Sequence, residues 1–171
     1  IEGGTASYNM PAGFRLTGPL NVAALGDALR DVILRHEPLR TVIVDNSGEA
    51  TGRLIPVLEG ELLLKTEDLS SLSRESKDQR IEAIVSAESS KVFSLTKDLT
   101  LRTKLLKLGD DEHVLILVMH HGSGDGVSIP VFIRDLSTAY AARLKGAEPQ
   151  FPPLPVSYAD YAAWQRRWFA Q

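Results

Sequence analysis

The chain contains no cysteine and no long hydrophobic run among its 171 residues. The absence of cysteine excludes a disulfide framework, a thiolate metal site and a cysteine nucleophile, and it makes the cytosol the simpler expectation. No apolar run approaches the roughly 18 to 20 residues that span a bilayer, and the sequence does not open with the basic-then-apolar order of a signal peptide. We therefore expect a cytoplasmic protein that does not enter a membrane.

An excess of positive charge is missing too. The 19 basic residues are scattered among 22 acidic ones, which gives a net charge of −3 and argues against nucleic-acid binding. The hydrophobic share of 43% is ordinary for a globular protein. A chain of this length buries about 70% of its unfolded surface and needs no structural metal. Because it opens at Ile1 and not at methionine, we expect a piece of a longer polypeptide.

The hydrophobic pattern predicts strands and helices in mixed order. Strands are expected within residues 9–20 and at 39–44, 51–57 and 61–66, followed by a hairpin of 101–108 and 114–119. The second hairpin strand is an unbroken apolar run, so it should be buried on both faces. Helices are expected at 21–37, within 70–91, at 127–144 and after a stiff proline-rich connector at 149–155. Asn21 and Ser157 stand where helix N-caps are expected.

The pair His120-His121 ends the buried strand and precedes a turn that contains glycine. Neighbouring residues of a strand point to opposite faces, so only one of the two histidines can face a given pocket. The same geometry disfavours a metal site, whose ligands must converge on one point, and we expect no bound metal. An imidazole, whose ordinary pKa is about 6.5, can accept a proton at physiological pH. Asp125 is the candidate for a buried carboxylate that fixes the turn.

The turn leaves two interpretations open. Backbone N–H groups at the helix start near Gly126 could stabilise an oxyanion, and one histidine would then take part in a reaction. Alternatively, both histidines are structural groups of the core or the turn. Ser128 is expected to cap the following helix and not to act as a nucleophile, because no base is paired with it. His36 and His113 are expected to make structural or solvent contacts.

Three segments carry a resemblance to a known family. Residues 120–128 read HHGSGDGVS and resemble the HHxxxDGxS signature of the condensation domains of non-ribosomal peptide synthetases. The segments RHEPLRT at 35–41 and YADYAAWQR at 158–166 are similar to two further motifs of that family, in the same order. The HHxxxDG signature is shared with chloramphenicol acetyltransferase and other coenzyme A acyltransferases, so the two flanking motifs carry the distinction.

This resemblance implies an α+β fold: a chloramphenicol acetyltransferase-like lobe with a mixed or antiparallel sheet flanked by helices. Residues 1–171 would form the N-terminal lobe of a two-lobed condensation domain, with the first family motif before or around Ile1 and the C-terminal lobe absent. The implied reaction is peptide-bond formation, in which an acceptor aminoacyl amine attacks a donor acyl or peptidyl thioester. Both substrates would arrive on the phosphopantetheine arms of carrier proteins, so the lobe itself would bind no cofactor. The implied partners are donor and acceptor peptidyl carrier proteins, the C-terminal lobe and adjoining synthetase domains.

The resemblance also implies roles for individual residues. His121 would be the active-site histidine, as a base or as a positioning group. His120 and Asp125 would hold the loop, and Gly126 would offer a backbone N–H close to the reacting centre. Arg40 would form an ion pair with Asp125.

Some positions depart from the family or have simpler roles. Gly122 and Gly124 stand where the family usually has bulkier or hydroxylated residues. Trp164 and Trp168 lie four residues apart on the last predicted helix and are expected in core or lobe-interface packing. Two rival functions stay open, namely a coenzyme A-dependent acyltransferase and a non-catalytic module that binds carrier proteins. For the isolated lobe we expect little or no condensation, since half of the implied substrate tunnel is missing.

Overall fold

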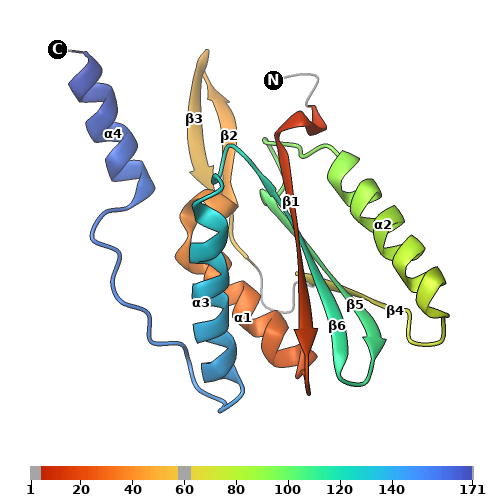
Figure 1. Ribbon diagram of the computed structural model, residues 1–171. Coiled ribbons are helices and arrows are strands. Elements are labelled where there is room, and N and C mark those ends of the chain that lie inside the picture. The colour runs from red at the N-terminus through yellow and green to blue at the C-terminus, as the bar shows by residue number, and fades with distance from the viewer. Residues whose placement is uncertain (1–4, 58–62, 171) are drawn as a thin grey trace.

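The structure is a computed structural model that describes residues 5–57 and 63–170 (Figure 1). The place expected for the first family motif, before or around Ile1, lies outside these residues, as does part of the strand expected at 61–66. The elements are η1 (Ala6–Tyr8), β1 (Asn9–Thr17), α1 (Val22–Arg35), η2 (Glu37–Arg40), β2 (Thr41–Asn46), β3 (Glu49–Leu54), β4 (Leu64–Asp68), α2 (Arg74–Ser90), β5 (Leu101–Gly109), β6 (Glu112–His120), α3 (Ser128–Arg143) and α4 (Tyr158–Phe169).

A sheet of four strands organises the fold, in the order β1-β6-β5-β4. Strands β1, β6 and β5 pair antiparallel, whereas β4 joins the edge parallel to β5. Strands β2 and β3 form a separate antiparallel hairpin. The α+β class and the mixed sheet with flanking helices, both predicted from the sequence, are confirmed.

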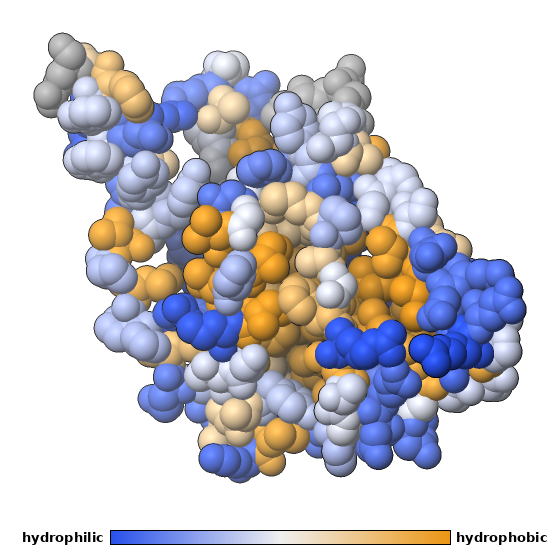
Figure 2. All heavy atoms as spheres, in the orientation of Figure 1, coloured by the Kyte–Doolittle hydropathy of each residue, from blue (hydrophilic) through white to orange (hydrophobic). Residues whose placement is uncertain are grey.

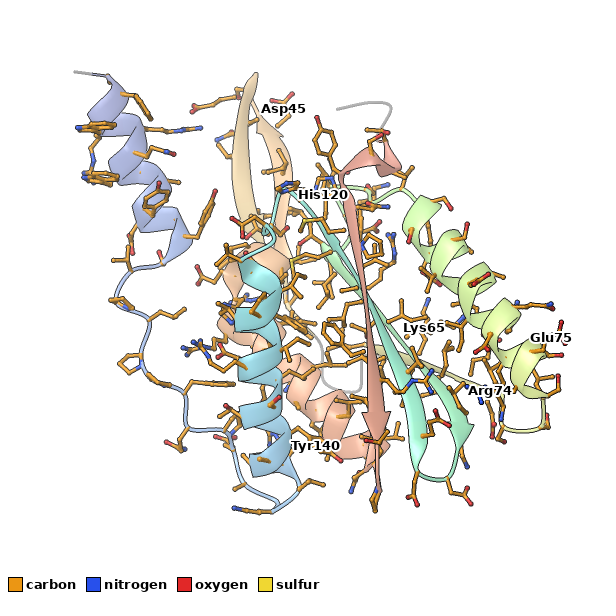
Figure 3. The ribbon with its side chains drawn as sticks, viewed as in Figure 1. Asp45, Lys65, Arg74, Glu75, His120 and Tyr140 are labelled. Atoms are coloured by element: carbon orange, nitrogen blue, oxygen red, sulfur yellow. The ribbon has the colours of Figure 1, made fainter. Side chains whose placement is uncertain are left out.

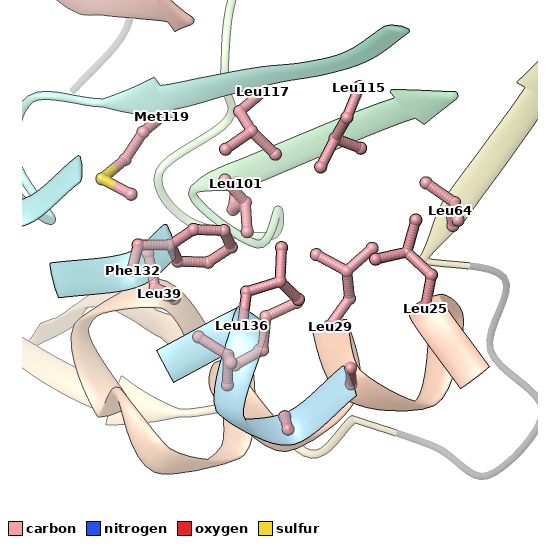
Figure 4. Packing of buried hydrophobic residues seen from close by; sticks show 14 of the residues in the cluster. Leu25, Leu29, Leu39, Leu64, Leu101, Leu115, Leu117, Met119, Phe132 and Leu136 are labelled. Atoms are coloured by element: carbon pink, nitrogen blue, oxygen red, sulfur yellow. The ribbon is translucent and has the colours of Figure 1, made fainter. Parts of the chain in front are cut away.

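The core lies on both faces of the sheet. One cluster joins α1 and α3 to the face of β6 that carries Leu115, Leu117 and Met119 (Figure 4). A second cluster packs α2 against the opposite face, which carries Ile116 and Val118. Strand β6 is therefore buried on both faces, as its unbroken apolar sequence predicts.

The predicted helix starts are confirmed by their caps. The Asn21 side chain accepts a hydrogen bond from the backbone N–H of Ala24 at 3.0 Å. The Ser157 hydroxyl oxygen accepts one from the N–H of Asp160 at 3.1 Å, so α4 begins where the sequence pattern places it. Each cap satisfies one of the N–H groups that the first helical turn leaves unpaired.

Strands β2 and β3 show how some boundaries differ from the prediction. Strand β2 begins at Thr41 and not at residue 39, because residues 37–40 form a 3₁₀ turn with Pro38 near its start. Strand β3 spans residues 49–54 and ends before Pro56. The β2–β3 turn has positive φ at Ser47 (57°) and Gly48 (89°), the combination that a tight two-residue hairpin turn requires.

Helix α4 stands apart from the sheet at the end of the proline-rich connector (Figure 1). Trp164 and Trp168 are 52% and 58% exposed, so the expectation that they pack in the core of this chain is wrong. Apolar surface is also visible between α3 and β1 and beside α2 (Figure 2). Within the described residues, no helix combines the length and the apolar character needed to cross a membrane.

Candidate functional site

Strand β6 presents its last residue and the residue after it to different sides of the sheet. His120, labelled in Figure 3, continues the face of Val118, and its ring centroid lies 5.9 Å from that of Phe93 and 6.0 Å from that of Tyr8. His121 follows Met119 onto the other face and lines a cavity. The alternation of strand side chains thus separates the two histidines, as predicted.

The cavity beside His121 has a volume of about 910 Å³. Its walls come from the end of α1 and η2, from the turn after β6, from the start of α3, and from the connector with the start of α4. The lining residues include Arg35, His36, Glu37, Pro38, Leu39, His121, Gly122, Ser123, Gly124, Asp125, Val127, Ser128, Tyr158 and Tyr161. All three motif segments noted in the sequence therefore contribute to one cavity.

The ring of His121 is oriented by the turn itself. Its Nδ1 lies 3.0 Å from the carbonyl oxygen of Gly124. A carbonyl oxygen only accepts, so Nδ1 carries the hydrogen, and in the neutral ring Nε2 holds the free electron pair. His121 is exposed on the cavity wall, where Nε2 can accept a proton from a bound molecule.

Asp125 fixes the turn at the start of α3. Its Oδ1 accepts hydrogen bonds from the N–H groups of Val127 and Ser128, each at 3.0 Å, and from the Ser128 hydroxyl at 2.9 Å. The Ser128 hydroxyl bond, followed by the backbone N–H bonds, lowers the pKa of Asp125. The carboxylate is exposed, so the expectation that it is buried is wrong. Ser128 takes part in this cap, as predicted.

The predicted ion pair between Arg40 and Asp125 does not form among the described residues, and that expectation is corrected. Asp125 is held by the N-terminus of α3, whereas Arg40 Nε is buried and has no hydrogen-bond partner within residues 5–57 and 63–170. Matching two opposite charges in the motifs selected a pair that does not form. The motif arginine that does pair with an aspartate is Arg35, and its partner is Asp135 on α3.

Asp135 is the buried carboxylate behind the cavity, with a side chain 6% exposed. It accepts hydrogen bonds from Arg35 Nε at 3.0 Å, from His36 Nε2 at 2.9 Å and from Arg134 at 2.9 and 3.0 Å. Burial acts to raise the pKa of Asp135, but the bonds from Arg134, His36 and Arg35 together lower it. This cluster joins the end of α1 to α3 on the cavity wall. His36 is thus structural, as expected.

His120 supports the same turn from the other side. Its Nδ1 accepts the backbone N–H of Gly122 at 3.0 Å, which requires Nδ1 to be unprotonated. Burial, and to a lesser degree the neighbouring His121, lower the pKa of His120 and so favour this state.

The turn glycines are confined by these contacts. A Cβ on Gly122 would lie 3.0 Å from Nδ1 of His120, and one on Gly124 would lie 2.8 Å from the sulfur of Met119 and 2.9 Å from Cβ of Ser128. Gly126, by contrast, is not among the residues that line the cavity, although Asp125 and Val127 on either side of it are.

The two histidines face apart, so they cannot share a metal. In the part of the chain that the structure describes, no group of three or more His, Asp or Glu residues is arranged to hold one.

Comparisons with known proteins show the family to which the chain belongs. The family model "Condensation domain" matches residues 1–171. The "Probable non-canonical nonribosomal peptide synthetase (NRPS) CymA" of Salinispora arenicola is 42% identical over 97% of this chain, and a dimodular nonribosomal peptide synthase of Bacillus subtilis is 37% identical over 97%. The solved X-domain from teicoplanin biosynthesis aligns with a TM-score of 0.86 and 33% identity, over 97% of this chain and 35% of that one. The chain spans 2% of the length of the first synthetase and 7% of the second.

Proposed function

The chain belongs to the condensation-domain family of non-ribosomal peptide synthetases, and on that premise we propose that it is the N-terminal lobe of a domain that joins two carrier-bound substrates through a peptide bond. One observation carries the proposal. Segments at residues 35–39, 121–125 and 157–161, each from a different motif, line a single cavity on which His121 is exposed. The chemistry of the reaction needs a proton acceptor at that position.

In the proposed reaction, the amine of the acceptor aminoacyl group attacks the thioester carbonyl of the donor. A carbon–nitrogen bond forms, the carbon–sulfur bond breaks, and the amine loses one proton. His121 Nε2 accepts this proton and returns it to the departing thiolate, so charge and atoms balance. The hydrogen bond from Nδ1 to the Gly124 carbonyl keeps the ring in the tautomer that this step needs.

The thioesters in this proposal are supplied by donor and acceptor peptidyl carrier proteins, on phosphopantetheine arms. An opening of about 910 Å³ is large enough for the end of such an arm together with an aminoacyl group. The site uses no bound cofactor of its own in this scheme. Binding energy comes from the carrier arms and the cavity walls, while His121 and the turn supply the chemistry.

A second lobe completes the site in this proposal. The chain covers 35% of the aligned X-domain, and the aromatic side chains of α4 are exposed, with Trp164 and Trp168 stacked 6.0 Å apart. Exposed aromatic clusters of this kind are typical of surfaces that another unit covers. In this proposal the second lobe also supplies the missing walls of the site, so the isolated chain should show little or no condensation.

A binding role without catalysis is the second candidate. The teicoplanin X-domain, with a TM-score of 0.83 in that structure, has been solved in complex with OxyB, so a protein of this fold can serve as a docking partner. A coenzyme A-dependent acyltransferase is a weaker candidate, because two of the cavity walls come from motifs that resemble those of condensation domains. Both candidates predict results that differ from ours in one assay.

The assay mixes the complete parent domain with carrier proteins loaded with donor and acceptor, and it follows peptidyl transfer by mass spectrometry. We expect transfer by the wild-type domain and its loss in His121→Ala. Transfer that is undiminished in the variant would overturn the role of His121. Absence of transfer in both proteins, with carrier binding retained, would favour the docking role, and acylation of a free acceptor from coenzyme A would favour the third candidate.

A further inference from the structure

The face of the sheet opposite the cavity holds a cluster of side chains that contacts His120, next to the turn that carries His121. Arg102 on β5 projects towards the C-terminal end of α2, where it donates hydrogen bonds to the carbonyl oxygens of Lys91 at 2.6 Å and Glu88 at 3.0 Å. Its guanidinium carbon lies 3.6 Å from the centroid of the Phe93 ring. Asn9 on β1 donates to the same Lys91 carbonyl at 2.9 Å, so the end of α2 is fastened to both strands.

Phe93 connects this cluster to His120. The Phe93 side chain is 3% exposed, and its ring meets the His120 ring edge to face at 5.9 Å, with an interplanar angle of 81°. Arg102 therefore covers one side of Phe93 while His120 contacts another. His120 in turn accepts the N–H of Gly122 within the turn that holds His121.

The loop between α2 and β5 has a second connection to the same place. The carbonyl oxygen of Thr100 accepts the backbone N–H of His120 at 2.9 Å, and the N–H of Thr100 donates to the carbonyl of Leu39 at 3.0 Å. Residues 91–102 thus contact the His120 ring, the His120 backbone and a segment that lines the cavity. None of these residues lines the cavity itself.

We propose that Arg102 and Phe93 are positioning residues for the condensation reaction, acting through His120 on the turn that carries His121. The inference rests on the proposed function of His121. Arg102 fixes Phe93 by hydrogen bonds to the end of α2 and by a cation–π contact. Phe93 then shields one side of the half-buried His120 ring from water and holds the ring in place, so that its Nδ1 stays an acceptor for Gly122.

Protonation of His120 would break this chain of contacts, because a protonated Nδ1 cannot accept a hydrogen bond. Tyr8 of η1 and Phe93 lie beside the His120 ring, and the Arg102 cation lies against Phe93. His121 is the next residue in the chain and points to the opposite face of the sheet, and Glu88 of α2 lies 3.7 Å from Arg102 Nε. Burial and, to a lesser degree, His121 lower the pKa of His120, so entry of water beside Phe93 when Arg102 is removed favours the charged ring. Removal of Arg102 therefore raises the pKa of His120.

The test uses the complete parent domain as wild type, Arg102→Met and Phe93→Leu, with Arg80→Met as the matched control. Arg80 lies on α2 and pairs with Glu67, so its loss removes one cation without touching the cluster. Peptidyl transfer is measured against pH, and the His120 ring is titrated by NMR with labelled histidine, assigned by its absence in His120→Asn. We expect transfer to fall roughly 5- to 30-fold in Arg102→Met, as the loss of a buried cation–π contact and hydrogen bonds predicts.

The acid limb of the rate profile and the His120 titration should both move to higher pH in Arg102→Met and Phe93→Leu, and neither should move in Arg80→Met. A His120 titration that stays at the wild-type pH in both cluster variants overturns the inference, even if transfer falls. This outcome differs from the one that would refute the proposed function, namely undiminished transfer in His121→Ala. The NMR titration needs no turnover, so it tests the inference whether or not the domain catalyses peptidyl transfer.

Discussion

Gly124 is the position where one methyl group should do most harm to the site. A Cβ there would lie 2.8 Å from the Met119 sulfur and 2.9 Å from Cβ of Ser128. Such non-bonded atoms prefer separations of about 3.5 to 4.0 Å, so the overlap amounts to roughly 0.6 to 1.2 Å. Met119 is 2% exposed within the core, and Cβ of Ser128 is attached to the first turn of α3. The flexible Met119 side chain borders the cavity and can shift, but Cβ of Ser128 is fixed to α3, so the turn must move instead.

The movement reaches His121 directly, because the carbonyl of Gly124 is the acceptor that orients its ring. A displacement of about 1 Å at a reacting group can cost on the order of 10²-fold in rate. Overpacking of this kind costs about 1 to 3 kcal/mol of stability. We therefore expect Gly124→Ala to lose roughly 10- to 100-fold in peptidyl transfer while the domain still folds.

Two further glycine substitutions complete the series. Gly122→Ala should lose less activity, since its Cβ would meet only the His120 ring, at 3.0 Å from Nδ1 and 3.4 Å from Cε1. Gly109→Ala, at the other end of the β5–β6 hairpin, meets nothing within 4 Å and should behave as wild type. Transfer rates and urea unfolding curves are measured for all three variants. Equal activity of Gly124→Ala and Gly109→Ala would refute the reasoning.

The remaining predictions concern the carboxylates of α3 and its turn. Asp135→Ala leaves two arginines and His36 without their shared partner. It should lower the free energy of unfolding in urea by about 3 to 5 kcal/mol. The control Asp110→Ala, at a side chain 97% exposed, should change that free energy by no more than about 0.5 kcal/mol. A loss below about 1 kcal/mol for Asp135→Ala would contradict the burial argument. Asp125→Ala should lower the thermal midpoint at pH 7, because the carboxylate caps α3. Since folding lowers the pKa of Asp125, its stabilisation is present above the ordinary value of about 3.9 and is lost as the pH falls through the lower folded value. A penalty that persists at pH 2 would show that the cap does not depend on charge.

Much of this site follows from local rules. The period of a strand separates His120 from His121, and the unbroken apolar run of β6 predicts that both faces beneath them are filled. Caps at Asn21 and Ser157 predict where α1 and α4 begin. These features depend on residues close together in the sequence, so the sequence alone is enough to predict them.

Features that depend on distant pairs were not predictable in the same way. Arg40 and Asp125 have the right charges to pair, but the sequence does not say that α3 carries Asp135 to the Arg35 side chain. No sequence signal pointed to Arg102 or Phe93, because their importance arises only when α2 ends beside β6. The exposure of Trp164 could not be read from its residue type, since a large aromatic side chain is as common in a core as at an interface.

The most direct test of catalysis by His121 compares the same substitution at both histidines. Asparagine places a polar atom where Nδ1 of histidine lies but has nothing at Nε2. His120→Asn keeps an acceptor for the Gly122 N–H, and His121→Asn keeps a donor for the Gly124 carbonyl while removing Nε2. We predict that peptidyl transfer by the complete domain falls about 10²- to 10⁴-fold in His121→Asn and less than about 10-fold in His120→Asn. Equal losses in the two variants, or a larger loss in His120→Asn, would contradict the assignment of catalysis to the cavity face.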